Sequence, residues 1–125
     1  MKYSREFPNQ LGAITAARRY VADLLEHVPP APCFDVELMV SELATNCVRH
    51  TGSGFILSLE IDDDDIRVEV TDTASGTPRL RYPTPKQTTG RGLHIIEGLS
   101  DGWGVETDHD SPGKTVWFTY RLASQ

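Results

Sequence analysis

The apolar residues of this chain change their spacing partway along its length, and this change constrains the fold more than any other feature of the sequence. Residues 10–28 and 34–50 place apolar side chains three and four apart, which predicts two amphipathic helices. Residues 55–61 and 66–72 alternate apolar and polar side chains, which predicts two strands joined as an antiparallel hairpin. The aspartates at 62–65 lack the spaced ligands and distal glutamate of a calcium loop, so we expect a solvated turn there.

Prolines, turn residues and apolar spacing predict the other elements. Asn9 is the expected N-cap of the first helix, and Pro29, Pro30 and Pro32 are expected to end that helix and separate it from the second. A short edge strand, a long loop, a short helix and two final strands are predicted at residues 3–7, 73–89, 93–99, 103–108 and 114–122. This order predicts an α+β fold, a two-layer α/β sandwich, with residues 1–125 forming a single domain.

Composition narrows the classes of function. The formal charge is −6 and the pI about 5.1, and no basic patch of the kind that binds nucleic acid stands out. No apolar run approaches the roughly 20 residues that span a bilayer, and the first residues lack a signal-peptide core, so we expect a cytoplasmic location and no membrane partner. Cys33 and Cys47 lie in or beside apolar helical runs, which favours buried thiols over a disulfide or metal pair.

The predicted helix at 34–50 carries a polar pair along the edge of its apolar face. Glu42 and Asn46 are four residues apart, so they lie one turn apart and about 40° apart around the helix axis. A carboxylate and a carboxamide there must be solvated or paired, and such an oxygen pair suits a hard cation such as Mg²⁺. The alternative is a wet helix edge with both side chains in solvent. His50 is expected to lie at the helix C-terminus, where a positive charge interacts favourably with the helix dipole. Gly52 is expected to end the helix.

Two further features are candidates for binding. Asp72 falls in step with the inward residues of its strand, so its carboxylate is expected to project inward and to need a donor from backbone, water or ligand; the alternative is a turn-making aspartate. Gly90 and Gly92 come just before a helix, where bare backbone N–H groups approach an anion. By contrast, Gly113–Thr115 has the ending of a P-loop but is followed by a strand, so we reject that motif.

Four motifs in a fixed order resemble those of the histidine-kinase-like GHKL superfamily of ATP-binding domains: Ser41–His50, Asp72–Pro78, Gly90–Leu93 and Gly113–Thr115. Within it, the chain most resembles the small bacterial anti-sigma-factor serine/threonine kinases. The resemblance covers nearly the whole chain. It implies the Bergerat-type fold, with a mixed, mostly antiparallel sheet and about three helices on one face.

The resemblance also implies roles for individual residues. Asn46 resembles the Mg²⁺-binding asparagine, Glu42 the general base, and Asp72 the carboxylate that accepts from the adenine amino group. Thr115 resembles the strand threonine that backs up this aspartate. Further nucleotide contacts are implied for the two glycine boxes and the residues beside them: Gly76, Gly90, Arg91, Gly92 and Leu93. Residues 77–89 resemble a short nucleotide lid. The candidate lid cations are Arg81 and Lys86 within it and Arg91 just after it; we favour Arg91, and a solvent-facing arginine is the alternative.

By resemblance, the expected function is an ATP- and Mg²⁺-dependent kinase that phosphorylates an anti-sigma-factor antagonist and otherwise holds a sigma factor. Ala74 departs from the glycine expected in the first glycine box, and a methyl group there narrows backbone freedom. The alternatives are therefore a non-catalytic module that sequesters a partner, with or without ATP, and a structural partner protein with a degenerate pocket. The family often dimerises, and we expect Phe7, Tyr20 and Trp117 at an outer surface.

Overall fold

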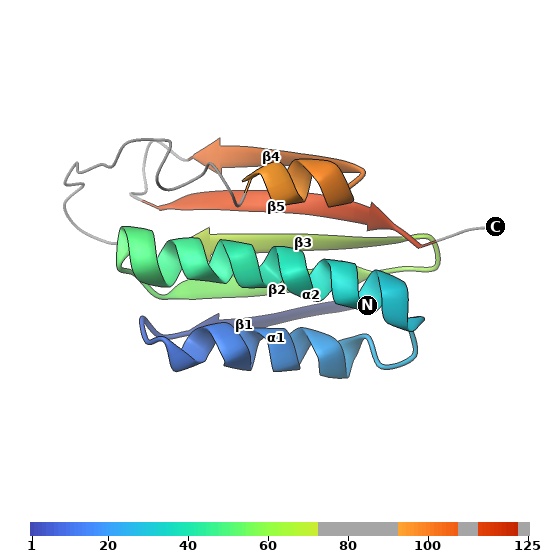
Figure 1. Ribbon diagram of the computed structural model, residues 1–125, viewed down its shortest axis with the longest axis horizontal. Coiled ribbons are helices and arrows are strands. Elements are labelled where there is room, and N and C mark those ends of the chain that lie inside the picture. Colours follow the sequence, from blue (N-terminus) through green and yellow to red (C-terminus); the bar gives the residue numbers. More distant parts are fainter. Residues whose placement is uncertain (73–92, 108–112, 123–125) are drawn as a thin grey trace.

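The structure is a computed structural model, and it describes residues 1–72, 93–107 and 113–122, with the side chains of residues 50 and 51 also outside the description. It has two layers, a sheet and a set of helices that covers one of its faces (Figure 1). The strands are β1 (Lys2–Phe7), β2 (Phe55–Ile61), β3 (Asp65–Asp72), β4 (Gly102–Thr107) and β5 (Lys114–Arg121). The helices are α1 (Gly12–Leu24), α2 (Pro30–Thr45), the π-helical turn η1 (Asn46–Thr51) and a short helix at residues 93–99.

The sheet has the strand order β1-β2-β3-β5-β4, and all pairings in the described part of the chain are antiparallel. β5 lies between β3 and the edge strand β4, so β3 and β4 run parallel to each other without pairing. The chain therefore leaves the middle of the sheet after β3 and returns to it with β5. These findings confirm the predicted α+β fold with helices on one face.

The core lies between the helices and the inner face of the sheet. The strand β3 alternates buried and half-buried residues along its whole length, as the period of two predicted, and β2 buries Phe55, Leu57 and Leu59. The helix α1 buries Ala13, Ala17 and Val21, and α2 buries a longer stripe made of Val36, Met39, Val40, Leu43 and Ala44. No helix in the described ranges is both long and apolar enough to cross a membrane.

The helix boundaries correct two predictions. α2 begins at Pro30, so the prolines start the second helix instead of separating it from the first, because proline fits the first helical turn, where its missing N–H is no loss. Asn9 is not the N-cap of α1; that position is Leu11, and the Asn9 side chain donates to the Gly52 carbonyl oxygen at 2.9 Å. Gly52 does end the helical run, with a φ of 67° in the left-handed region.

The three aromatic residues expected at an outer surface differ in their burial. Phe7 is buried, at 3% exposure, and stacks on Phe55 with ring centroids 5.2 Å apart, so its prediction as a surface residue was wrong. Phe7 is paired with the buried Phe55 across β1 and β2, so the two side chains share the inner face of the sheet. Tyr20 is half-buried with its ring edge against Phe7, and Trp117 is half-buried on the outer face with the Arg67 guanidinium 4.4 Å from the ring centroid.

Candidate functional site

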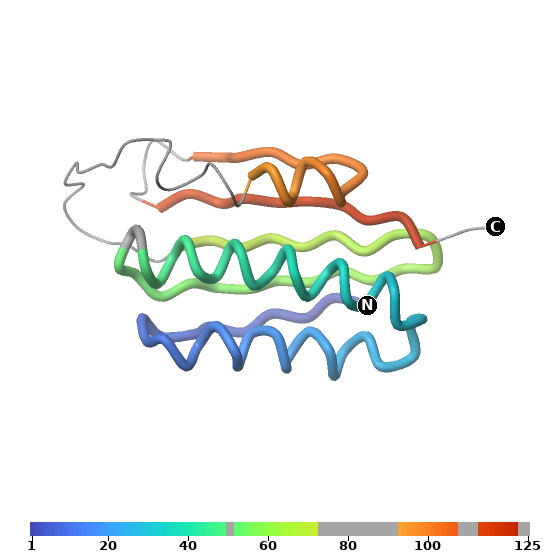
Figure 2. The backbone as a smooth tube through the Cα atoms, in the orientation of Figure 1, coloured from blue at the N-terminus to red at the C-terminus, as the bar shows by residue number. Residues whose placement is uncertain are grey.

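Three elements converge at one end of the inner face, where the C-terminal part of α2 with η1, the end of β3 and the start of β5 lie together (Figure 2). Two carboxylates are buried among these elements. Glu42 in the last turn of α2 is 9% exposed, and Asp72 at the end of β3 is 7% exposed. Burying a carboxylate is costly unless it is compensated, so this end of the fold is built for polar interactions.

The two residues of the predicted oxygen pair, Glu42 and Asn46, differ in their burial. Glu42 is buried, which contradicts a fully solvated position for it, and Asn46 one turn later is half-buried. Asn46 is also the residue at which the helix changes type. Its backbone N–H donates to the carbonyl oxygens of both Glu42 and Leu43, and the following turn is π-helical. Isolated π-helical turns occur frequently at functional sites.

The π-helical turn η1 was missed by sequence reasoning, because apolar spacing of three and four cannot distinguish an α-helical end from a widened turn. Its end is fixed by the backbone: the Ser53 N–H donates to the Cys47 carbonyl oxygen at 2.9 Å. The Ser53 hydroxyl donates to the Gly54 carbonyl oxygen at 2.8 Å, and this serine is buried. The turn is therefore anchored where the chain enters β2.

Asp72 projects to the inner face, in step with the buried residues of β3, as predicted. Gly113, just before β5, packs directly against it: a Cβ atom at position 113 would lie 2.5 Å from the Asp72 carbonyl oxygen and 3.0 Å from its Oδ1. Real side chains do not approach that closely, so only glycine fits beside this carboxylate. This contact could not be predicted from the sequence, because Gly113 and Asp72 lie far apart along the chain.

The Cys47 thiol reports the charges around it. Its pKa is raised to about 12, mainly by burial and additionally by the negative charge of Asp72, while the positive charge of Lys114 acts in the opposite direction. Cys47 on η1 is thus within electrostatic reach of both β3 and β5. Cys47 is buried and Cys33 half-buried, and both are free thiols, in agreement with the prediction that they form no disulfide.

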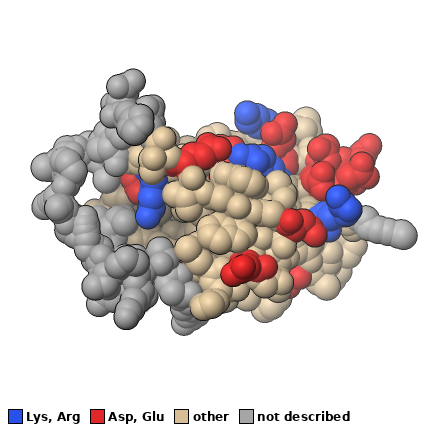
Figure 3. Space-filling model, turned by 90° about the horizontal axis from the view of Figure 1, so that it is seen from above, with Lys and Arg blue, Asp and Glu red and all other residues tan. Residues whose placement is uncertain are grey.

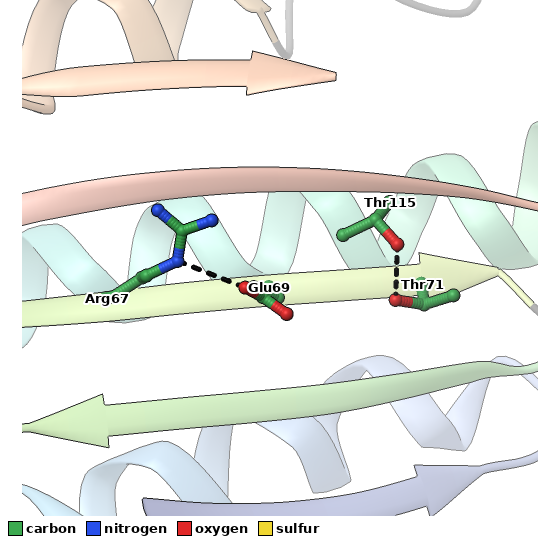
Figure 4. Close-up of polar contacts among 4 residues, drawn as sticks. All are labelled: Arg67, Glu69, Thr71 and Thr115. Carbon is green, nitrogen blue, oxygen red and sulfur yellow. Dashed lines mark hydrogen bonds and ion pairs between the residues drawn. The ribbon is translucent and has the colours of Figure 1, made fainter. Parts of the chain in front are cut away.

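Thr115 lies on the other face of the sheet. Its hydroxyl and that of Thr71 are 2.7 Å apart and share a hydrogen bond across the β3–β5 pair (Figure 4). Because side chains alternate along a strand, this pair points away from the face that carries Asp72. The two hydroxyls connect β3 to β5 immediately before Asp72. Thr115 therefore does not contact the Asp72 side chain from this face, and it can affect Asp72 only through the pairing of the two strands.

The remaining predicted site residues are only partly described. Leu93 is half-buried and begins the helix at 93–99, which confirms a helix directly after the glycine motif. The other candidates lie outside the described residues: Gly76, Gly90, Arg91 and Gly92, together with Ala74, Arg81 and Lys86. Within the described ranges, no group of three or more His, Cys, Asp or Glu side chains is arranged to hold a metal ion.

Comparisons with known proteins agree with this architecture. A family model described as a histidine kinase-like ATPase domain matches residues 7–120. The crystal structure of the RsbU and RsbW domains of Rv1364c from Mycobacterium tuberculosis superposes with a TM-score of 0.75 at 18% sequence identity, over 98% of this chain and 32% of that chain. The catalytic domain of histidine kinase ThkA gives a TM-score of 0.51 at 18% identity, covering 98% of this chain and 99% of that one. No curated protein matches this chain significantly.

Proposed function

This chain belongs to the family of histidine kinase-like ATPase domains, and we propose that it is an ATP- and Mg²⁺-dependent serine/threonine protein kinase of the anti-sigma-factor type. One observation carries the proposal. The fold implies ATP binding, and two carboxylates are buried at the same end of its sheet. These are Asp72, which is expected to bind adenine, and Glu42, which is expected to activate the acceptor hydroxyl.

Asp72 is the proposed adenine-binding residue. A carboxylate only accepts hydrogen bonds, and the 6-amino group of adenine only donates them, so the two are complementary. The absence of a side chain at Gly113 keeps the carboxylate from being displaced, because a Cβ atom there would collide with it. The hydroxyl pair of Thr71 and Thr115 holds the strand end in place from the outer face.

Asn46 is the proposed Mg²⁺ ligand. Its amide oxygen is a hard ligand, and its half-buried position at the α2–η1 junction leaves it open on one side. Mg²⁺ commonly binds through one or two protein oxygens plus substrate phosphate oxygens and water, which fits the lack of a three-ligand cluster in the described ranges. When bound, the ion neutralises the negative charge of the phosphates.

Glu42 is the proposed general base. Its carboxylate takes the proton from the serine or threonine hydroxyl of the protein substrate, and the hydroxyl oxygen forms a bond to the γ-phosphorus of ATP. The bond between that phosphorus and the bridging oxygen of the β-phosphate breaks, and ADP leaves. Burial of Glu42 restricts water around the carboxylate and fixes its direction on a rigid helix.

The proposed partners are proteins. The neighbour Rv1364c carries RsbU and RsbW domains in one chain, and this chain spans 32% of that structure, the size of one domain in a larger assembly. We propose that residues 1–125 form a single domain that phosphorylates an anti-sigma-factor antagonist and otherwise binds a sigma factor. Ala74 favours one alternative, a non-catalytic module that sequesters its partner, because a methyl group replaces the expected glycine.

Phosphotransfer to candidate antagonist proteins from the same organism tests the proposal. Wild-type protein with ATP and Mg²⁺ is expected to produce phosphoserine or phosphothreonine, and Glu42→Gln to lower the rate by about 10²- to 10⁴-fold. Calorimetric ATP titration is expected to give nearly equal affinities for these two proteins, and Asn46→Ala to remove the magnesium dependence. Glu37→Gln is the matched control, since Glu37 lies on the same helix, where it accepts from the Cys33 thiol at 3.2 Å.

The alternative makes opposite predictions. A sequestering module captures its partner equally well as wild type or Glu42→Gln, and neither protein transfers phosphate. Unchanged phosphotransfer by Glu42→Gln would remove Glu42 as the base while leaving the kinase in place. Absence of any specific ATP affinity would leave only the partner protein with a degenerate pocket.

A further inference from the structure

Lys114 lies on the helix-covered face of the sheet, although no motif assigns it a role. In β5, Phe118 is fully buried and Val116 and Tyr120 pack against the core, so the alternation of side chains places Lys114 on the same face. Lys114 is half-buried. A lysine that begins a strand on the core side of a sheet brings an ammonium group to the rim of the buried layer.

The strand register brings Lys114 beside Asp72. β3 and β5 are antiparallel, with Val70 opposite Val116 and Thr71 opposite Thr115. The pairing ends there; continued by one residue, it would bring Asp72 and Lys114 to neighbouring positions on the inner face. Both charges also act on the buried Cys47 thiol: Asp72 raises the pKa of Cys47 and Lys114 lowers it, so both side chains lie within electrostatic range of this residue.

We propose that Lys114 is a specificity-determining residue of the nucleotide pocket, and that it donates a hydrogen bond to N1 of adenine while Asp72 accepts one from the 6-amino group. This assignment rests on the proposed function, in which Asp72 holds the base. An ammonium only donates and a carboxylate only accepts, so the pair offers one donor and one acceptor side by side. Adenine presents the complementary pair on its Watson–Crick edge, the donor amino group next to the acceptor N1.

The same pair discriminates against guanine. In the same pose, guanine places the acceptor O6 against Asp72 and the donor N1–H against Lys114, so both contacts are mismatched. A site whose polar groups are left unpaired by the wrong ligand rejects it strongly. Lys114 thereby contributes to the preference for ATP through the ring nitrogen, in addition to the contribution of Asp72 through the amino group.

The test removes each partner of the proposed hydrogen bond in turn. Calorimetric titrations with Mg²⁺ compare ATP with 1-deaza-ATP, in which a C–H replaces N1, for wild type and Lys114→Met. Wild type is expected to bind 1-deaza-ATP about 10- to 100-fold more weakly than ATP, the usual range for one charge-assisted hydrogen bond. Lys114→Met is expected to bind ATP at that reduced affinity and to bind both nucleotides equally.

Two further variants and one analogue complete the experiment. Lys114→Arg retains a donor and is expected to keep the sensitivity to N1, which separates loss of the hydrogen bond from disturbance of the strand. Lys2→Met, an exposed lysine on the opposite edge strand, is expected to bind ATP as wild type does. 7-Deaza-ATP is changed at a ring position that the pair does not contact. Its affinity relative to ATP is therefore expected to be the same in wild type and Lys114→Met.

The outcomes distinguish this inference from the proposed function. An equal penalty for 1-deaza-ATP in wild type and Lys114→Met, or wild-type ATP affinity in Lys114→Met, would overturn the role of Lys114 and leave ATP binding intact. A wild-type protein that binds no ATP would overturn the proposed function, and the assignment of Lys114 with it.

Discussion

The hairpin of β2 and β3 has an aspartate at each end, and the two lie in opposite environments. At the closed end, Asp62 is exposed and its Oδ1 accepts from the backbone N–H groups of Asp65 at 2.8 Å and Asp64 at 3.0 Å. At the open end, Asp72 is 7% exposed and packs against Gly113. The residue type is the same, and the strands connecting the two positions are regularly paired throughout.

The difference between the two ends comes from what covers them. The carboxylate of Asp62 is satisfied by the turn that it belongs to. Acidic side chains gather at one end of the face that Figure 3 shows. Asp72 packs against Gly113 and lies within electrostatic range of Cys47 on η1, and both residues are distant from it in the sequence. The position of Asp62 is thus explained by its own turn, whereas the burial of Asp72 depends on elements that are distant in the chain.

The largest effect is expected from exchanging the carboxylate at each end for an amide. Asp72→Asn is expected to weaken ATP binding about 10- to 100-fold, because an amide is a weaker acceptor than a carboxylate for the adenine amino group. Asp62→Asn is expected to leave ATP affinity unchanged. Calorimetric titration of both variants measures the contrast, and equal affinities would remove the functional distinction between the two ends.

A second prediction concerns the glycine that packs against Asp72. Gly113→Ala is expected to destabilise the protein by about 1–3 kcal/mol and to weaken ATP binding, because the new Cβ collides with Asp72 backbone and side chain. Gly98→Ala is the control: a Cβ there meets nothing within 4 Å, and alanine in the helix at 93–99 is expected to stabilise by about 0.5–1 kcal/mol. Urea unfolding measures both, and an undestabilised Gly113→Ala would show that the contact relaxes freely.

The parts of the fold that follow from side-chain alternation were predictable from sequence. Period-two spacing placed β2, β3 and the inward direction of Asp72 correctly, because the alternation of a strand is a property of the backbone. The turn at Asp62 was also predictable, since its chemistry is local. The resemblance motifs then identified the family, which the match over residues 7–120 confirms.

The parts that depend on distant contacts were not predictable from spacing. Pro30 is compatible with ending one helix or starting the next, and the structure shows that it starts α2. The π-helical turn at Asn46 cannot be distinguished from an α-helical end by apolar spacing. The fit of Gly113 against Asp72 and the position of Lys114 depend on how β3 and β5 come together. The roles of Glu42 and Asn46 in chemistry stay predictions.

A third prediction uses the buried thiol beside Asp72. The pKa of Cys47 is raised from 9.0 to about 12 in the folded protein, first by burial and then by the charge of Asp72. Its contribution to stability is therefore complete below about pH 9 and is lost as pH rises toward 12, because only the unfolded thiol ionises in between. Cys47→Ala is expected to flatten the decline of unfolding free energy above pH 9.

The charge of Asp72 can be tested through the same thiol. Asp72→Asn is expected to lower the pKa of Cys47, so its alkaline decline begins at the same pH and ends earlier. Cys33 provides the comparison, because its pKa is raised to about 11 by burial and by its bond to Glu37, which Asp72→Asn leaves in place. Urea unfolding at a series of alkaline pH values measures these slopes, and an unchanged Cys47 contribution in Asp72→Asn would contradict electrostatic contact between the two.

The smallest effect is expected at the closed end of the hairpin. The backbone N–H groups of Asp65 and Asp64 hold the pKa of Asp62 below its ordinary value of 3.8. The stability that these hydrogen bonds contribute is therefore complete above the unfolded pKa of 3.8. It is lost as pH falls through the lower folded pKa, where the folded carboxylate takes up a proton. Asp62→Asn is expected to remove this acid dependence, with Asp63→Asn on the same exposed turn as control. Thermal unfolding between pH 2 and pH 6, about the range in which aspartates titrate, measures this acid dependence. A larger loss of stability in Asp62→Asn than in Asp72→Asn would mean that this hairpin depends more on the aspartate of the exposed turn than on the buried one.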